Sequence, residues 1–427
     1  METALARRHR LMGTSRLFYD APVHIVRGEG VWLWDDAGRR YLDAYNNVPV
    51  LGHAHPAVAE AVARQTERLA THSRYLSDTL LDYLDRLTGA LPGMESAVLT
   101  CTGSEANDLA LRAAHALTGA TGIVATAYCY HGNTKAVSQL NATNPPFDAE
   151  QGNIARVFAP DSLRPRGGSV EAMHTAFTAD IHRAIADLAA RGRGTSCLML
   201  CPILTFEGLP TLPKGFFDEA EAAIRAAGGI VIADEVQAGF GRTGALWGFE
   251  HVGLTPDIVT MGKAMGNGYP VAGLATRAEL LARTQEKIYY FNTFAANPVA
   301  AAAGMAVLDA LAAGDLPAHA ARTGAHLAAR LRALPDPGLA DIRNAGLFVA
   351  AELVRNPESN APDPTRTKRI VEGMRQAGIL LSALGPSGNI LKIRPPLPFS
   401  PEHADLLADT LADVLAATPP HDGPHEA

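Results

Sequence analysis

The sequence predicts an α/β protein. We expect a large domain with a mixed, mostly parallel sheet covered by helices, and a smaller α+β domain. In the middle of the chain, short uniformly apolar strands alternate with helices, which is typical of a sheet covered on both faces. After Asn297 an alanine-rich helix begins, and a mixture of helices and strands follows it. The chain has 427 residues, 47% hydrophobic and 19% charged, which is enough for more than one folded domain.

The elements are predicted in chain order. Residues 31–34 and 41–43 form a hairpin across a turn at 35–38, and helices follow at 56–69 and 77–91, the second with Ser77 as N-cap. The predicted strands of the large sheet are 97–100, 123–127, 197–203, 230–233, 258–261 and 271–275. The helices among them are 104–117 and 218–227, and the Pro-, Gly- and Asn-rich stretch 144–168 is a long loop.

The last hundred residues supply the rest of the small domain, with strands at 341–353, 379–381 and 390–393 between helices. We therefore divide the chain into four parts. Residues 1–55 are an N-terminal segment of the small domain, 56–307 the large domain, 308–418 the C-terminal small domain, and 419–427 a disordered tail.

Composition and charge exclude several classes of function. Lys and Arg number 37 against 44 Asp and Glu, a net charge of −7 without a basic stripe, so we expect no nucleic-acid partner. No apolar run is long enough to cross a bilayer, and the N-terminus lacks the apolar core of a secretory signal, although its arginine cluster leaves a mitochondrial presequence open. Four dispersed cysteines indicate a reducing cytoplasm, and His53 and His55 lack a third metal ligand.

One glycine run resembles a dinucleotide loop. Residues 239–244, GFGRTG, match G-x-G-x-x-G after a predicted strand. However, Asp234 and Glu235 intervene, and no amphipathic helix follows the glycines to receive a pyrophosphate. An NAD-binding oxidoreductase is therefore only a remote alternative.

Three features in order indicate pyridoxal 5′-phosphate (PLP). Gly103 and Ser104 lie where a strand meets a helix, a place suited to a phosphate. Asp234 ends an apolar strand, and Lys263 follows another strand among small residues, where burial would lower the pKa of its amine. Taken singly, these are a helix cap, an ion-paired acid and a surface lysine. Together they match the needs of PLP, which are a lysine Schiff base, an acid at the pyridine nitrogen and a phosphate site.

These stretches resemble the class III aminotransferases among the fold type I PLP enzymes. The matching segments are GSEANDLALR (103–112), YHG (130–132), DEVQAGFGRTG (234–244), TMGKAMGNGYP (260–270) and TFAANP (293–298). The resemblance implies that Lys263 forms the Schiff base and moves the proton of Cα, while Asp234 keeps the pyridine nitrogen protonated. The other implied cofactor-binding residues are Gly103 and Ser104 at the phosphate, Tyr130 and Val236 on the two ring faces, and Gln237 at the phenolic oxygen. His131 is implied as well, with a purely structural role as the alternative. Thr293 would reach the phosphate from the second subunit of a homodimer.

The resemblance implies transfer of an amino group from a small primary amine or amino acid to a keto acid, but two positions depart from the family. Many members read E-P-x-Q-G-E where this chain has Cys201 and Phe206 at the two Glu positions, with Glu207 one residue away. The family arginine before P-P-L falls on Lys392, with Arg394 two residues later. Recognition of the keto acid is therefore in question, because lysine lacks the bidentate fork of arginine.

An alternative reaction comes from another set of segments. YLDAYNNV (41–48), GHAHP (52–56) and SRYL (73–76) are similar to those of the O-phosphoethanolamine phospho-lyases, which eliminate phosphate from a phosphorylated amine. We expect Asn46, Asn47 and Arg74 at the substrate entrance, where an arginine would suit a phosphate, although Arg74 is equally explained as a structural ion-pair residue.

Overall fold

A seven-stranded sheet forms the centre of the larger part of the molecule. The computed structural model describes residues 3–15, 17–141, 146 and 151–420. The strand order is β4-β10-β9-β8-β7-β5-β6, and only β10 is antiparallel to its neighbours. In that order the strands are β4 (Ser96–Thr100), β10 (Ala272–Thr276), β9 (Ile258–Met261), β8 (Ile230–Asp234), β7 (Thr195–Leu200), β5 (Gly122–Thr126) and β6 (Ile154–Val157).

Both faces of this sheet are buried, as the uniformly apolar strands predict. Alternate residues of each strand belong to two different core clusters, because successive side chains of a strand point to opposite faces. Val124 belongs to the same core cluster as Phe177 of α6, whereas Ile123 belongs to the cluster that contains Leu109 of α4. The helices of this part are α2 (Pro56–Arg68), α3 (Asp78–Gly89), α4 (Gly103–Thr118), α5 (Lys135–Ser138), α6 (Val170–Ala190), α7 (Asp218–Ala226), α8 (Gly248–Val252), α9 (Ala278–Gln285) and α10 (Pro298–Ala313).

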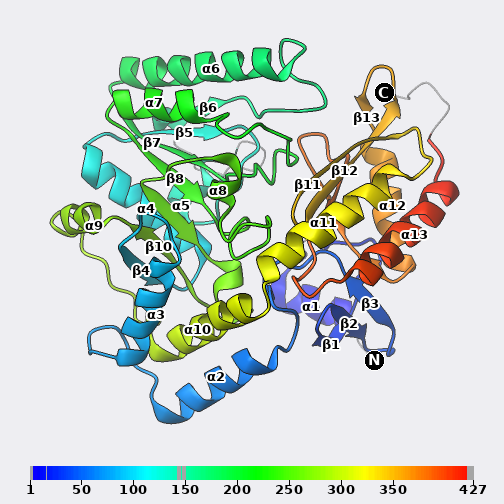
Figure 1. The fold of residues 1–427 in the computed structure, drawn as a ribbon, viewed down its shortest axis with the longest axis horizontal. Coiled ribbons are helices and arrows are strands. Elements are labelled where there is room, and N and C mark those ends of the chain that lie inside the picture. The colour runs from blue at the N-terminus through cyan, green and yellow to red at the C-terminus, as the bar shows by residue number, and fades with distance from the viewer. Residues whose placement is uncertain (1–2, 16, 142–145, 147–150, 421–427) are drawn as a thin grey trace.

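The smaller part combines the two ends of the chain. Strands β11 (Leu339–Ala345), β12 (Phe348–Asn356), β16 (Ile390–Ile393) and β15 (Ser382–Leu384) form an antiparallel sheet, with β13 (Ala361–Pro362) paired to β12. The N-terminal strands β1 (Ile25–Glu29), β2 (Trp32–Asp35) and β3 (Arg40–Asp43) form a second sheet with β14 (Ile379–Leu380). Its helices are α11 (Leu316–Arg332), α12 (Pro364–Gln376) and α13 (Pro401–Ala417), and Figure 1 shows them beside these sheets, with α1 (Ala4–Met12) nearby.

Most predicted elements are present, with four differences. Strand β7 ends at Leu200 rather than at 203, because the chain turns there into the loop that carries Phe206. The predicted loop 144–168 contains β6, and the predicted strand 341–353 is two strands separated by a turn at Gly346. Ser77 occupies the N-cap position of α3, but its side chain bonds no helix amide. The predicted tail lies mostly in 421–427, outside the described residues, and the four domain boundaries stay predictions.

The glycine run 239–244 packs closely against the smaller part of the molecule. The structure has turns there, and the next helix begins only at Gly248. A Cβ atom on Gly346 of the small domain would lie 2.3 Å from the carbonyl oxygen of Arg242, and one on Gly244 would lie 2.9 Å from the Cβ of Ala321. The NAD-binding alternative is therefore wrong, because the glycines allow close packing against the small domain and no helix opens at them.

No described helix is by itself long and apolar enough to span a membrane. Helices α10 and α11 reach the necessary length and apolar composition only when they are taken together, and the chain bends by 64° between them.

Candidate active site

Asp234 lies at the carboxyl end of β8 and is 4% exposed. Its Oδ2 accepts hydrogen bonds from His131 Nδ1 at 2.7 Å and Asn107 Nδ2 at 3.0 Å, and its Oδ1 accepts one from the Val236 amide at 3.0 Å. A carboxylate offers about four acceptor positions, so one position remains for a further donor. The side chain is thus fixed in orientation and still able to bind a protonated ring nitrogen.

His131 is fully enclosed beside this carboxylate. Burial alone would lower the pKa of its imidazole, but the neighbouring Cys129 and Asp234 outweigh burial and raise the pKa to about 10. The ring is therefore protonated near neutral pH and balances the charge of Asp234. Its Nε2 is buried without a hydrogen-bond partner among the described residues.

Asn107 is a site residue that sequence reasoning missed. Its Nδ2 also donates to the carbonyl oxygen of His131 at 2.6 Å, and its Oδ1 accepts from Thr260 Oγ1 at 2.5 Å. It therefore connects α4, β8 and β9. Helical periodicity could have indicated it, because Asn107 lies four residues after Gly103 and so on the same face of the helix.

The N-terminus of α4 approaches two other backbone segments. A Cβ on Gly103 would lie 2.8 Å from Val236 Cγ2, and one on Gly262 would lie 3.2 Å from Gly103 Cα. Thr102, rather than Ser104, caps the helix, in a capping box with Glu105. Ser104 lies in the first turn, and its Oγ accepts a hydrogen bond from the Asn133 amide at 3.2 Å.

Lys263 follows β9 in a short 3₁₀ turn and has φ +28°, a strained angle for a residue with a side chain. Burial is the main influence on its amine and lowers the pKa, Asp234 opposes that shift, and Arg394 adds to it. The neutral amine, which is the nucleophilic form, is therefore reached at lower pH than for a free lysine.

Two further cations lie near Lys263. Lys392 of β16 is 4% exposed, and its Nζ lies 4.5 Å from the centroid of the Phe206 ring. Arg394 Nε donates to the carbonyl oxygen of Tyr45 at 3.0 Å. Within the described part of the chain neither of these side chains has a carboxylate within ion-pair distance. Burial, together with repulsion from Arg394 and Lys263, lowers the pKa of Lys392 well below its usual value.

Gln237 connects Arg394 to the N-terminal segment. Its Oε1 accepts hydrogen bonds from Arg394 and, at 3.4 Å, from Asn47 Nδ2, while its Nε2 donates to Thr205 Oγ1 at 3.1 Å. Tyr130 is half-exposed, with its ring centroid 5.2 Å from that of Phe206. The structure thus gathers one acid, one strained lysine, two more cations and two aromatic rings around the carboxyl ends of β8 and β9.

Comparison with known proteins decides the family. The sequence model of the aminotransferase class-III family matches residues 17–415 of this chain. The chain is 35% identical over 422 residues to "Alanine--glyoxylate aminotransferase 2 homolog 2, mitochondrial" of Arabidopsis thaliana, covering 96% of this chain and 86% of that protein. This protein belongs to the class III aminotransferase family.

Other similar proteins carry a different activity in their names. "Ethanolamine-phosphate phospho-lyase homolog 1" of Caenorhabditis elegans is 32% identical over 439 residues, with 97% of this chain and 93% of that protein covered. A solved phospholyase from Arthrobacter in complex with phosphoethanolamine is 42% identical, with a TM-score of 0.94 and coverage of 98% of this chain and all of that one. The predictions of a class III, fold type I, PLP-dependent enzyme of aminotransferase type are confirmed, and the phospho-lyase alternative has relatives of comparable similarity.

The cofactor of this class III enzyme is PLP, and the observed site fits it. Asp234 has an acceptor position left, Lys263 has a depressed amine pKa, and α4 begins at Gly103, a residue without a side chain, at the helix end that favours anions. When bound, PLP withdraws electrons from Cα of the amine joined to it, which makes the Cα proton removable.

Among the described residues, three predicted site residues make no hydrogen bond or ion pair with this group. Arg74 is exposed and donates to Tyr289 OH at 2.9 Å, with its guanidinium 3.9 Å from the Phe291 ring centroid. Thr293 is exposed as well. Glu207 is buried and accepts a hydrogen bond from Thr126 Oγ1 on β5. It lies near enough to Lys392 to raise the pKa of that amine, without an ion pair to it.

Proposed function

We propose that this class III enzyme removes phosphate and ammonia from a small phosphorylated primary amine such as O-phosphoethanolamine. The observation that carries the proposal is the pair of buried basic side chains, Lys392 and Arg394, near Lys263. Among the described residues neither of them has a carboxylate within ion-pair distance. A phosphate dianion bound beside these two groups would favour their charged forms and pair with that charge. The similarity to the Arthrobacter phospholyase supports the same conclusion.

The family resemblance and the contacts of Lys263, Asp234 and His131 support the following roles. Lys263, with its lowered pKa, takes the proton from Cα of the amine, and Asp234 holds the proton at the pyridine nitrogen of the cofactor. Tyr130 and Val236 cover the two ring faces, and Gln237 contacts the phenolic oxygen. Gly103 and Ser104 receive the cofactor phosphate at the N-terminus of α4. His131 is a positioning residue that orients Asp234.

Lys392 and Arg394 hold the phosphate of the substrate as it leaves. After Lys263 has taken the Cα proton, the electron pair of the C–H bond forms a C=C bond and the Cβ–O bond breaks, with its electrons leaving on phosphate. Water then completes the reaction, so that O-phosphoethanolamine and water give acetaldehyde, ammonia and phosphate. Stabilising the charge of the leaving group is the part of this step that the two cations supply.

Amino transfer to a keto acid is the second candidate, and the aminotransferase relatives favour it. Arg394 and Lys392 could hold the carboxylate of a keto acid. However, the position where many family members have their second glutamate is occupied by Phe206, whose ring lies under the Lys392 ammonium.

The experiment separates the two reactions. The holoenzyme is incubated with O-phosphoethanolamine without a keto acid, while phosphate and ammonia are assayed. Continuous release of both in equal amounts is expected. A single turnover that stops until a keto acid is added would instead establish amino transfer and contradict the proposal.

We also propose a homodimer that completes each site with residues of the second copy. The exposed apolar side chains Tyr75, Leu76, Tyr289 and Phe294 are 65%, 95%, 75% and 75% exposed. The segments that carry them are joined by the hydrogen bond from Arg74 to Tyr289. Large apolar side chains exposed on two contacting segments support burial of these segments by another chain. In the dimer Arg74 and Thr293 would reach the partner's site.

For location we propose the cytoplasm, supported by the four cysteines, all of them free. The names of some relatives include a mitochondrial location. Fractionation of cells that express the protein would test this, and recovery in mitochondria would contradict it.

A further inference from the structure

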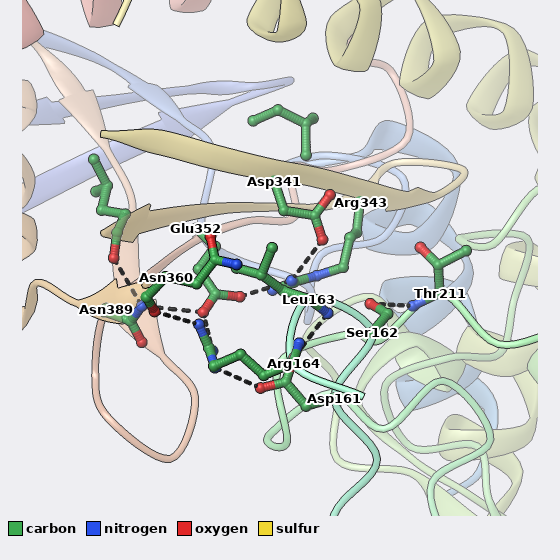
Figure 2. Close-up of polar contacts among 12 residues, drawn as sticks. Asp161, Ser162, Leu163, Arg164, Thr211, Asp341, Arg343, Glu352, Asn360 and Asn389 are labelled. Carbon is green, nitrogen blue, oxygen red and sulfur yellow. Dashed lines mark hydrogen bonds and ion pairs between the residues drawn. The ribbon is translucent and has the colours of Figure 1, made fainter. Parts of the chain in front are cut away.

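The long segment between β6 and α6 contacts the small domain through a buried charged network, shown in Figure 2. Asp161 folds this segment into a tight turn by accepting hydrogen bonds from the amides of Leu163 and Arg164 at 2.9 and 3.1 Å. Its other oxygen accepts from Arg164 Nε at 3.0 Å. The guanidinium of Arg164 is thereby directed out of the large domain.

On the small domain Glu352 of β12 receives that guanidinium. The Glu352 carboxylate is 1% exposed and bonds Arg164, Arg343 Nη1 at 2.7 Å and Asn389 Nδ2 at 3.1 Å. Arg164 Nη1 also donates to the carbonyl oxygen of Asn360 at 3.0 Å. Among these contacts, the side chain of Arg164 is the link between the two domains (Figure 2).

Electrostatics makes this contact specific. Burial raises the pKa of Glu352, but Arg343 and Arg164 outweigh burial, and the net pKa lies below the usual value. Glu352 is therefore charged at neutral pH. A buried charge that loses one of its partners is costly, so the position of Arg164 is closely fixed relative to β12.

The network lies directly beside the strand that carries Lys392. In the sheet register Glu352 is opposite Ile390, and Ala350 is opposite Lys392. A Cβ on Gly208, two residues after Phe206, would lie 2.7 Å from Ile390 Cδ1. The residues around Arg164, Glu207, Gly208 and Glu352 line a cavity of about 90 Å³. The loop carrying Phe206 and the strand carrying Lys392 therefore meet at this network.

We propose that Arg164 and Glu352 are positioning residues for recognition of the anionic end of the substrate. Their ion pair holds β12, and with it the paired strand β16, against the segment that contains Arg164. Ser162 of the same segment accepts a hydrogen bond from the amide of Thr211, which follows the loop at 204–210. The ion pair thereby sets the position of Lys392 relative to Phe206 and the substrate phosphate. The inference rests on the proposed function, because it deepens the role given to Lys392. Neither residue contacts the reacting atoms.

The test uses steady-state kinetics of the holoenzyme with three variants. Arg164→Met removes the ion pair with Glu352, and Arg164→Lys keeps the positive charge at position 164. Glu352→Gln removes the negative charge of Glu352 and keeps the shape of its side chain. Since the Arg164 side chain is 33% exposed, its substitutions do not leave a cavity in the core. Small displacements of a binding group have large effects, so we expect KM for O-phosphoethanolamine to rise about tenfold in Arg164→Met and Glu352→Gln, with kcat within about twofold. Arg164→Lys should recover part of the lost affinity.

A control and a second substrate separate positioning from general stability. Asp336→Asn breaks a buried ion pair with Arg366 that lies within the small domain. It should lower the melting temperature without raising KM. The rate of Cα proton exchange in ethanolamine, which has no anionic end, should be unchanged in Arg164→Met. Equal losses with both substrates, or the same KM increase in Asp336→Asn, would overturn the inference.

The proposed function itself is decided by the wild-type enzyme. If it releases no phosphate, that proposal fails, and KM for the keto acid in amino transfer becomes the measure of positioning. A keto-acid KM unchanged in Arg164→Met would then overturn the inference as well.

Discussion

The charge states of single residues determine what this site can do. Lys263 has a depressed amine pKa, His131 a raised one, and Asp234 is fixed by three donors. The pKa of Lys263 is lowered mainly by burial, whereas that of His131 is raised by its neighbours against the effect of burial, so a single substitution can alter either one.

Lys263→Ala should abolish turnover. The substitution removes both the covalent attachment of the cofactor and the group that moves the Cα proton, so we expect a loss of at least about a thousandfold. Lys263→Arg, which keeps the charge without a usable nucleophile, should be equally inactive. Steady-state assays and the loss of the visible Schiff-base absorbance measure the effect. Retained activity in either variant would refute the role.

Because of His131, the free energy of unfolding should fall as the pH rises above neutrality. Its folded pKa is raised to about 10, above an unfolded value of about 6.5, so its contribution is complete below about pH 6.5 and disappears as pH rises through about 10. The stability advantage of the wild type over His131→Gln, measured by urea unfolding, should therefore shrink between pH 7 and pH 10. A constant advantage across that range would show that the imidazolium is not the stabilising form.

At the level of elements, three backbone segments come close together at the N-terminus of α4. Gly103 contacts Val236, and Gly262 lies against Gly103. The glycines let the first amides of the helix face a phosphate without side chains between them.

Gly103→Ala should weaken cofactor binding. The new Cβ would lie 2.8 Å from Val236 Cγ2, and overpacking of this kind costs about 1–3 kcal/mol. We expect the dissociation constant for PLP, measured by titration of the apoenzyme, to rise about tenfold or more. The matched control is Gly89→Ala, at the end of α3, where an added Cβ meets nothing within 4 Å. Equal affinity of both variants would contradict the geometry.

At the scale of the whole molecule, the proposed second subunit accounts for residues that the single chain leaves on its surface. Arg74 and Thr293 are exposed, far in sequence from each other, yet lie on segments in contact. Their proposed roles therefore depend on assembly.

Phe294→Asp should shift the protein to monomers and remove most of its activity, because it places a charge in the proposed interface. Light scattering and activity measure the two effects. Leu406→Asp on α13, another exposed apolar side chain, is the control and should leave the assembly unchanged. A dimeric, active Phe294→Asp would contradict the proposed interface.

Mixing inactive Lys263→Ala with an inactive Thr293 variant tests shared sites. Random pairing should recover about a quarter of the wild-type activity, because half of the dimers are mixed and each has one intact site. No recovery would mean that Thr293 acts within its own chain.

Much of the fold was predictable because apolar strands and helical periodicity are local signals. The strands at Asp234 and Lys263, the hairpin of β2 and β3 and the alanine-rich α10 all lie within a few residues of their predicted ranges. Strand β6 was missed, because its four residues lie in a stretch rich in Pro, Gly and Asn. Helix capping by Thr102 instead of Ser104 was missed as well, since both are good caps and only the helix start decides between them.

The family, the cofactor and the roles of Gly103, Asp234 and Lys263 could be inferred from the chain alone, because they depend on residue types at short, regular spacings. The folded molecule was needed to show that Asn107 and His131 hold Asp234, that Lys392 lies over Phe206, and that Arg164 bonds Glu352 across the domains. These partners are separated by 103 to 188 residues. Such contacts depend on how whole elements pack, and local sequence patterns do not encode that packing.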